Sequence, residues 1–579
     1  MYTTLENVPS REPMRTGIIV VTVSLFLLAP GAEAFHGNLS GMQARLAGRA
    51  YSEFLSGYLA YRSGNLDAAL GGYQKALRYA ENEPEILYEI GNVLVKKGNL
   101  DEARGYLERA LEADPAHIRS RYLLAGVLAA TGEKEKAAGL YERVLSDQPE
   151  KEETYLHLST LYAERGDFAK AEKILTTLVS RNSEAYFAYY YRGRLLAAQK
   201  KFEEALADFD KALSLYPHFD GALVDSGGVL EMMGKHAEAE ARYRKALANN
   251  PANPFVRERL GRVLILEKKL DQAVGQYEEL KKFSDGNLDV RAKLGLLYLD
   301  QDRFDDAINE FRFVLTAQPE NGQVRYFLAT AYLENGLYPE AEKEFRAIPD
   351  SSPVYREAML YLAMSLGKRK KLDEAIRLTQ ELRGKFPDDI DLMIFLGTEY
   401  EEAKRFEEAL AVLDEAAKKD PDNARVFFSL GVVYDKLGKL EKVVESMKRT
   451  IELEPKHATA MNYLGYTYAD RNMELDEAER LIVRALELRP DDGYFVDSLA
   501  WVYFRKGDLP RAEREIRRAL SLIPDDPIIL EHMGDILAGE GKHEEAAPYF
   551  EKSIAKGHEN PEEIRRKLKQ VRKGDSGLK

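Results

Sequence analysis

The chain of 579 residues contains no cysteine, one tryptophan and only nine histidines. The missing cysteines exclude disulfides, thiolate zinc sites, thiol catalysis and a lipid anchor carried on a cysteine side chain. The histidines are scattered, and none forms a His-Glu-x-x-His motif. The nearest approach to a metal site is Glu531-His532 with Asp535, in which a carboxylate follows the histidine by one helical turn. We expect neither a metal nor a cofactor.

Hydrophobic runs long enough to cross a bilayer, about 20 residues, are also lacking. One shorter apolar run, from Gly17 to Pro30, follows Arg11 and Arg15 and precedes Ala32-Glu33-Ala34. This order predicts a secretory signal over residues 1–34, cleaved after Ala34, with an uncleaved anchor as the alternative. We expect an exported protein of a bacterial periplasm. Outer-membrane association stays open, but a lipoprotein is excluded because there is no cysteine.

What the sequence does contain is a repeat of 34 residues. Numbered within each repeat, position 8 is always small: Gly57, Gly91, Ala125, Ser159, Gly193, Gly227, Gly261, Gly295, Ala329, Ala363, Gly397, Gly431, Gly465, Ala500 and Gly534. Position 20 is alanine in every repeat except one, where Val443 replaces it. A single inserted residue near Asn472 shifts the frame of the last repeats. A fixed period of this length predicts a solenoid, whose units bury their apolar faces against their neighbours.

One repeat shows the expected local structure. In the second repeat, Leu87, Ile90 and Leu94 lie on one face of a helix. Gly98 then suits a turn residue with positive φ, and Asn99 can cap a second helix. Proline near position 32 closes most repeats, because proline is tolerated where a helix starts. Each unit is therefore predicted to be a hairpin of two helices.

These residues resemble the tetratricopeptide repeat family, whose pattern has small residues at position 8, alanine at 20, an aromatic residue at 24 and proline at 32. The resemblance implies an all-α, right-handed superhelix of about fifteen repeats over residues 50–561. Residues 35–49 would form a lead-in, and residues 562–579 a capping helix and tail. The basic segment from Glu562 to Lys573 carries an apolar stripe that suits a cap, with a membrane or partner contact as the alternative.

The remaining chain leaves no room for a catalytic domain, because domains usually exceed about 50 residues. We therefore expect a non-enzymatic protein with no small-molecule substrate. The net charge of −14, with acids and bases interspersed, argues against nucleic-acid binding. Protein partners remain as the expected ligands, and contact with a membrane would be indirect.

In this family the first helix of each hairpin lines a concave groove, and positions 2, 5, 9 and 12 would face it. Exposed aromatic side chains at such positions favour partner binding. The alternative is that each ring packs half-buried against the next repeat. We expect Tyr466, Tyr494, Trp501 and Phe504 to converge into one cluster. The candidate groove residues are Tyr88, Asn92, Tyr122, Tyr190, Arg194, Arg262, Tyr326, Phe428, Tyr466, Tyr494, Trp501 and Phe504.

A second, narrower resemblance covers Asn462 to Gly507, including the inserted residue. This stretch looks like exported proteobacterial repeat proteins, among them a lipoprotein adaptor that activates a periplasmic C-terminal processing protease. It implies a scaffold or adaptor of the cell envelope, with a periplasmic protease or envelope-complex subunits as partners. A scaffold for envelope assembly or polysaccharide secretion is the alternative, and a repeat-linked glycosyltransferase is a remote one.

Overall fold

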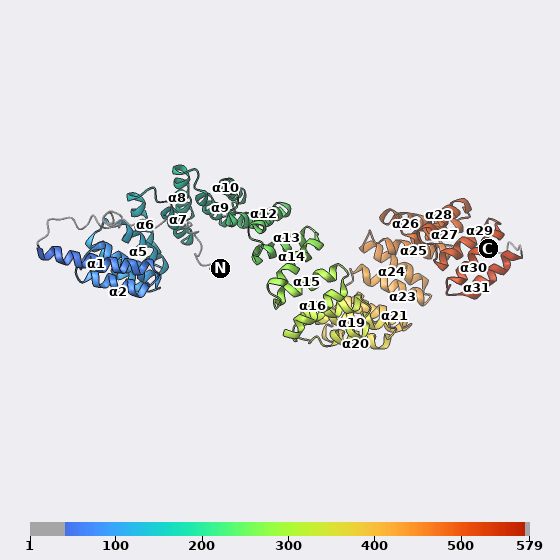
Figure 1. Ribbon diagram of the computed structural model, residues 1–579. Coiled ribbons are helices and arrows are strands. Elements are labelled where there is room, and N and C mark those ends of the chain that lie inside the picture. The colour runs from blue at the N-terminus through green and yellow to red at the C-terminus, as the bar shows by residue number, and fades with distance from the viewer. Residues whose placement is uncertain (1–40, 574–579) are drawn as a thin grey trace. The chain divides into compact units, whose positions relative to one another are not determined.

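The computed structural model describes residues 41–573, with side chains from residue 45 onward. The predicted signal at residues 1–34 lies outside this range. Between residues 41 and 573 every regular element is an α-helix (Figure 1). The described residues divide into two compact units, residues 41–283 and 284–573, which we describe separately.

The first unit contains seven helical hairpins among its described residues. Its helices are α1 Gly41–Arg62, α2 Leu66–Leu77, α3 Pro84–Lys96, α4 Leu100–Ala113, α5 Ile118–Ala130, α6 Lys134–Asp147, α7 Glu152–Glu164, α8 Phe168–Arg181, α9 Tyr186–Ala198, α10 Phe202–Leu215, α11 Asp220–Met232, α12 His236–Asn249, α13 Pro254–Leu266 and α14 Leu270–Phe283.

The second unit contains eight hairpins and one further helix among its described residues. Its helices are α15 Leu288–Asp300, α16 Phe304–Ala317, α17 Gly322–Glu334, α18 Tyr338–Arg346, α19 Tyr355–Lys368, α20 Leu372–Lys385, α21 Ile390–Glu402, α22 Phe406–Lys419, α23 Ala424–Lys436, α24 Leu440–Leu453, α25 Ala458–Asp470, α26 Leu475–Leu488, α27 Gly493–Arg505, α28 Leu509–Leu522, α29 Pro527–Gly539, α30 His543–Ala555 and α31 Pro561–Arg572.

The turn inside each hairpin follows from one backbone conformation. Gly98 has a φ of 80° between α3 and α4, as its place in the sequence predicts. The equivalent residue is left-handed in every one of the fifteen hairpins, and in six of them it is not glycine. These six are Lys200, Lys268, Asp302, Lys370, Lys404 and Asn472. A non-glycine residue in the left-handed conformation carries a steric cost. The geometry of the turn therefore overrides the preference of these residues for negative φ.

The small residues at positions 8 and 20 lie where the two helices of a hairpin touch. The alanines at position 20 have no exposed surface, as Ala103 and Ala239 illustrate. A Cβ atom added to Gly91 would lie 2.8 Å from Leu107, and one added to Gly227 would lie 2.6 Å from the ring of Tyr243. The predicted frame and the all-α repeat fold are therefore confirmed. Val443 takes the place of alanine and is also fully buried.

Three local departures interrupt the regular pattern. Helix α18 has nine residues and ends at Arg346, so an irregular segment fills the rest of the ninth repeat. The inserted residue falls in the turn between α25 and α26, where Asn472 and Glu474 both have positive φ. At the N-terminal end, α1 starts at Gly41, so part of the predicted lead-in extends the first helix.

Helix α31 follows the last hairpin at the place where the first helix of a further repeat would lie. Ile564 is fully buried and Val571 is 3% exposed, while the other faces of α31 carry charged residues. This is the arrangement expected of a cap. None of the helices between residues 41 and 573 combines the length and apolar character that crossing a membrane requires.

Candidate protein-binding groove

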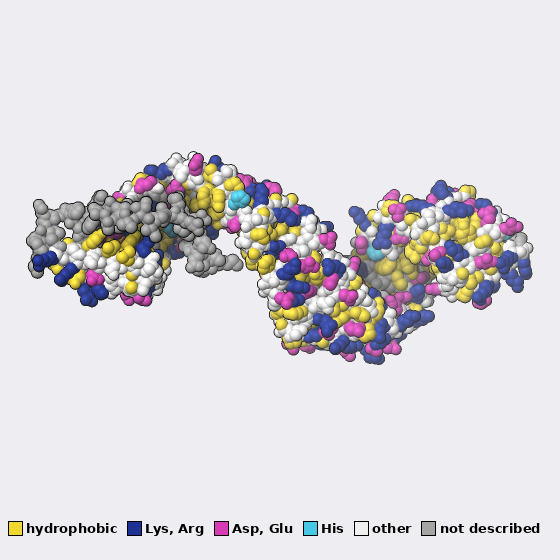
Figure 2. Space-filling model, viewed as in Figure 1, with side chains coloured by type: hydrophobic (Ala, Val, Ile, Leu, Met, Phe, Trp, Pro, Cys, Tyr) yellow, Lys and Arg dark blue, Asp and Glu magenta, His cyan; other side chains and the backbone are white. Residues whose placement is uncertain are grey.

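The first helices of repeats 5, 6 and 7, which are α9, α11 and α13, form a groove of about 540 Å³ in the first unit. Seven of its thirteen lining residues stand at the expected positions 2, 5, 9 and 12 of these helices, and two more stand at position 13. The lining residues are Arg194, Ala197, Phe209, Val224, Asp225, Gly228, Val229, Glu231, Met232, Phe255, Arg259, Arg262 and Leu266. Figure 2 shows hydrophobic side chains as scattered patches among charged ones on the visible surface.

Gly228 keeps the floor of the groove open. It occupies position 9 of repeat 6, where the two neighbouring repeats carry Arg194 and Arg262. A Cβ atom at residue 228 would approach the guanidinium of Arg259 at 3.1 Å. A larger side chain would therefore fill the space that the flanking arginines border.

Two acidic side chains pair with the arginines of this groove. Glu231 accepts from Arg259 at 2.8 Å and lies 3.5 Å from Arg262. Asp225 lies 3.5 Å from Arg194 and accepts a hydrogen bond from the hydroxyl of Tyr190 at 3.0 Å. Burial raises the pKa of Asp225, although its partners partly oppose the shift. Three guanidinium groups thus face two carboxylates.

The predicted candidates nearer the N-terminus contact neighbouring repeats. Tyr88 is half-buried, with the guanidinium of Arg119 at 4.1 Å from its ring centre. Asn92 donates to the hydroxyl of Tyr61 at 3.2 Å. Tyr122 packs edge-on against the ring of Tyr141, and the ammonium of Lys151 lies 3.5 Å from its ring centre. Burial raises the pKa of Tyr122 to about 12.

Two candidates in the second unit behave in the same way. The ring of Tyr326 lies edge-on to that of Tyr361, with ring centres 5.9 Å apart. Phe428 stacks on His457, with ring centres 5.0 Å apart. Both aromatic residues are half-buried. Their rings thus bridge consecutive repeats, which is the packing role that the sequence left open.

The expected convergence of four C-terminal rings holds for three of them. Trp501 stacks on His532 with ring centres 4.2 Å apart and on Phe504 at 5.0 Å, while Tyr466 lies 6.3 Å from His532. Tyr494 does not join them, because it is two turns earlier on α27.

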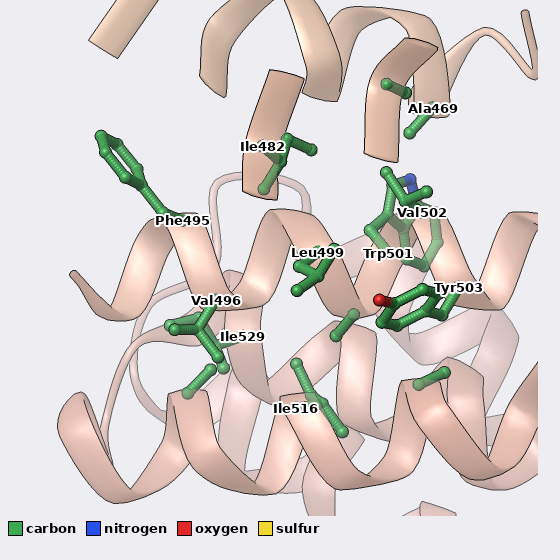
Figure 3. Close-up of a cluster of buried hydrophobic side chains, with 14 of the residues drawn as sticks. Ala469, Ile482, Phe495, Val496, Leu499, Trp501, Val502, Tyr503, Ile516 and Ile529 are labelled. Carbon is green, nitrogen blue, oxygen red and sulfur yellow. The ribbon is translucent and has the colours of Figure 1, made fainter. Parts of the chain in front are cut away.

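Tyr494 is instead 55% exposed and directs its hydroxyl toward Asp526 at 3.4 Å. Trp501, by contrast, is 9% exposed and belongs to the buried core of the last repeats (Figure 3).

A buried polar network surrounds His532. Its Nδ1 atom lies 2.8 Å from the carboxylate of Asp497. Burial disfavours the charged imidazole, but the nearby carboxylates outweigh it and raise the pKa of His532. Lys567 of α31 pairs with Glu531 at 2.6 Å and with Asp535 at 2.5 Å.

The side chains of Glu531, His532 and Asp535, which come nearest to a metal site in the sequence, are thus engaged in ion pairs with other side chains. Among residues 41–573, no group of three or more acidic or histidine side chains is placed to hold a metal ion.

Sequence reasoning missed much of the lining of the groove. Phe255 and Gly228 line the groove from the expected positions 2 and 9 but are not among the predicted candidates. Met232 and Leu266 stand at position 13, just beyond the expected register. The sequence signal that could have identified them is an apolar residue at the C-terminal end of two consecutive first helices.

The chain belongs to the tetratricopeptide repeat family. One model of this repeat matches residues 54–118, 88–152, 156–218, 230–287, 292–355 and 498–561, and a second matches 366–430 and 400–464. Repeats of this family support a protein–protein interaction scaffold, and their fold is generally non-catalytic.

A curated relative from Pseudomonas aeruginosa, described as a tetratricopeptide-repeat-containing protein, is 48% identical over 46 residues, which is 8% of either chain. Among solved structures, a repeat protein from Parabacteroides merdae is 22% identical over 43% of this chain and 98% of its own, with a TM-score of 0.32. The repeat protein YrrB, whose structure is described as having an unusual peptide-binding site, is 21% identical over 34% of this chain and 97% of its own, with a TM-score of 0.29.

Proposed function

We propose that this protein is a non-enzymatic adaptor of the bacterial cell envelope that holds a partner protein in the groove of repeats 5–7. The observation that carries the proposal is the groove itself, which is open, bordered by exposed arginines and lined by large apolar side chains. An extended segment of a partner fits such a site, because backbone and side chains can lie along several consecutive helices.

The envelope setting rests on the export signal predicted at residues 1–34. The resemblance of Asn462–Gly507 to an exported protease adaptor favours a periplasmic protease as the partner. The envelope location and the protease partner are tested independently of the groove. Fractionation of native cells tests the location, and a protein confined to the cytoplasm would contradict it.

Site-specific photo-cross-linking tests the groove. A photoreactive p-benzoylphenylalanine replaces Phe255, which is 56% exposed in the groove, or Phe168, which is 37% exposed at the start of α8 outside it. Both positions already carry a phenyl ring, so the substitution changes little. We expect discrete cross-linked partners from the Phe255 position and fewer from the Phe168 position. Equal products, or none, would refute partner docking in this groove.

A further inference from the structure

The charges of the groove in repeats 5–7 are not balanced within it. The carboxylate of Glu231 is 8% exposed and is engaged by Arg259 and by the hydroxyl of Tyr243. Arg259 in turn is only 27% exposed, so these groups form an internal pair. This pair stabilises the wall of the groove and offers little to a ligand.

Arg194 and Arg262 differ from Arg259 in exposure. Their side chains are 56% and 52% exposed, and each makes a long ion pair of 3.5 Å. They border the open position at Gly228 from the repeat on each side. A guanidinium group has five N–H donors, so both arginines can still donate to a carboxylate in a charge-assisted contact.

Large apolar side chains stand beside these arginines. Met232, Phe255 and Leu266 are 62%, 56% and 57% exposed, and all three line the same groove. Exposed apolar groups gathered around a hollow usually mark an interaction site. A ligand that satisfied only the arginines would leave these surfaces in water.

We propose that the groove binds an extended protein segment in which an aspartate or glutamate side chain adjoins large apolar side chains. This inference rests on the proposed function and specifies the chemistry of the partner. The carboxylate contacts Arg194 and Arg262 above Gly228, and the apolar side chains cover Met232, Phe255 and Leu266. A basic segment is disfavoured because it would place like charges together without water to screen them.

Three fluorescein-labelled, C-terminally amidated peptides test the inference by fluorescence anisotropy with the full chain. The first has the sequence Ser-Leu-Glu-Phe-Glu-Leu-Ser, the second has lysine for each glutamate, and the third has serine for each leucine and phenylalanine. We expect the first to bind about tenfold more tightly than either of the others. Its binding should also weaken as salt is raised, because exposed charges are screened.

Matched variants locate the binding. The double variant Arg194→Gln with Arg262→Gln should weaken the first peptide about tenfold, whereas Arg244→Gln, at an arginine on the second helix of repeat 6, should leave it unchanged. Gly228→Leu should abolish binding by filling the groove. Gly275→Leu is its control, since a Cβ atom there meets nothing within 4 Å.

The outcomes separate the inference from the proposed function. In one outcome, the lysine or the serine peptide binds more tightly than the first peptide, and Gly228→Leu abolishes that binding. This result would overturn the inferred chemistry and leave the groove as a docking site. Binding that is indifferent to Gly228→Leu, or no binding by any peptide, would also overturn the inference. The cross-links from position 255 judge the proposed function independently, because they do not depend on these peptides. A preference for the same acidic peptide with a free carboxyl end would assign the site to chain termini and reject an internal side chain.

Discussion

The same helix positions line an open groove in repeats 5–7 and a buried core in repeats 13–15. At position 9 the first group has Arg194, Gly228 and Arg262, and a groove opens there. The second group has Tyr466, Trp501 and Asp535 at the same position. There the rings and His532 pack together, and the surface closes into core. The comparison teaches that the register of the repeat offers a site, while the residue at position 9 of the middle repeat, Gly228 in one group and Trp501 in the other, decides whether the site stays open.

The largest expected difference between the two regions is the cost of removing an aromatic ring. Trp501→Ala should lower the free energy of unfolding of the last repeats by about 3–5 kcal/mol, because it leaves a cavity beside His532. Phe255→Ala in the groove should change stability by less than about 0.5 kcal/mol, since its ring is already exposed. Urea unfolding followed by circular dichroism, with hydrogen exchange in α27 and α13, measures both. Similar losses of stability in the two variants would contradict the distinction between a buried Trp501 and an exposed Phe255.

The second unit should also respond to pH through a buried carboxyl group. Glu399 is 5% exposed, and burial raises its pKa to about 7 from 4.5. The folded state therefore binds this proton more tightly than the unfolded state does. The stabilisation of the folded state by this proton is complete below pH 4.5 and is lost as the pH rises through 7.

Glu399→Gln should consequently stabilise the protein at pH 8 by about 1–3 kcal/mol and have little effect at pH 5. Thermal melts of both proteins at the two pH values provide the test. An equal effect at both values would show that the group does not titrate as inferred. Glu407→Gln, at an exposed acid on α22, is the control.

Adjacent glycines in α11 sharpen the comparison within the first unit. Gly227 faces the ring of Tyr243, and its substitution by leucine should cost about 1–3 kcal/mol through overpacking. Gly228 faces the groove and only the flexible end of Arg259, so Gly228→Leu should cost less stability than Gly227→Leu while it blocks binding. Denaturant midpoints of the two variants decide the matter. If Gly228→Leu were the more destabilising, the assignment of the groove face would be wrong.

The smallest expected effect concerns the turns. Lys268→Gly should stabilise the hairpin of α13 and α14 by about 0.5–1 kcal/mol, because lysine at a φ of 59° is strained and glycine is not. Asn472→Gly in the turn after α25 should gain less, since asparagine tolerates this conformation better. Thermal midpoints compare them. A loss of stability at residue 268 would mean that the greater chain entropy of glycine dominates.

The sequence predicted the fold more fully than the site, and the reason is physical. The contacts that fix a hairpin, such as Gly227 with Tyr243 or the turn at Gly98, recur at set spacings and are visible one repeat at a time. The groove depends on several repeats at once: their positions predict Arg194 and Arg262 as groove residues, but the opening at Gly228 between them is visible only when the three repeats are stacked. Trp501 failed as an exposed candidate because His532, contributed by the next repeat, covers its ring.

Helix α31 has a consequence for how molecules of this protein meet one another. Its residues Ile564 and Val571 cover the apolar face of the last hairpin, and Lys567 neutralises two carboxylates there. Without that cover, the terminal hairpin would present the surface on which every preceding repeat stacks its successor. A truncation before Pro561 would therefore expose an apolar end that can join a second chain in head-to-tail fashion.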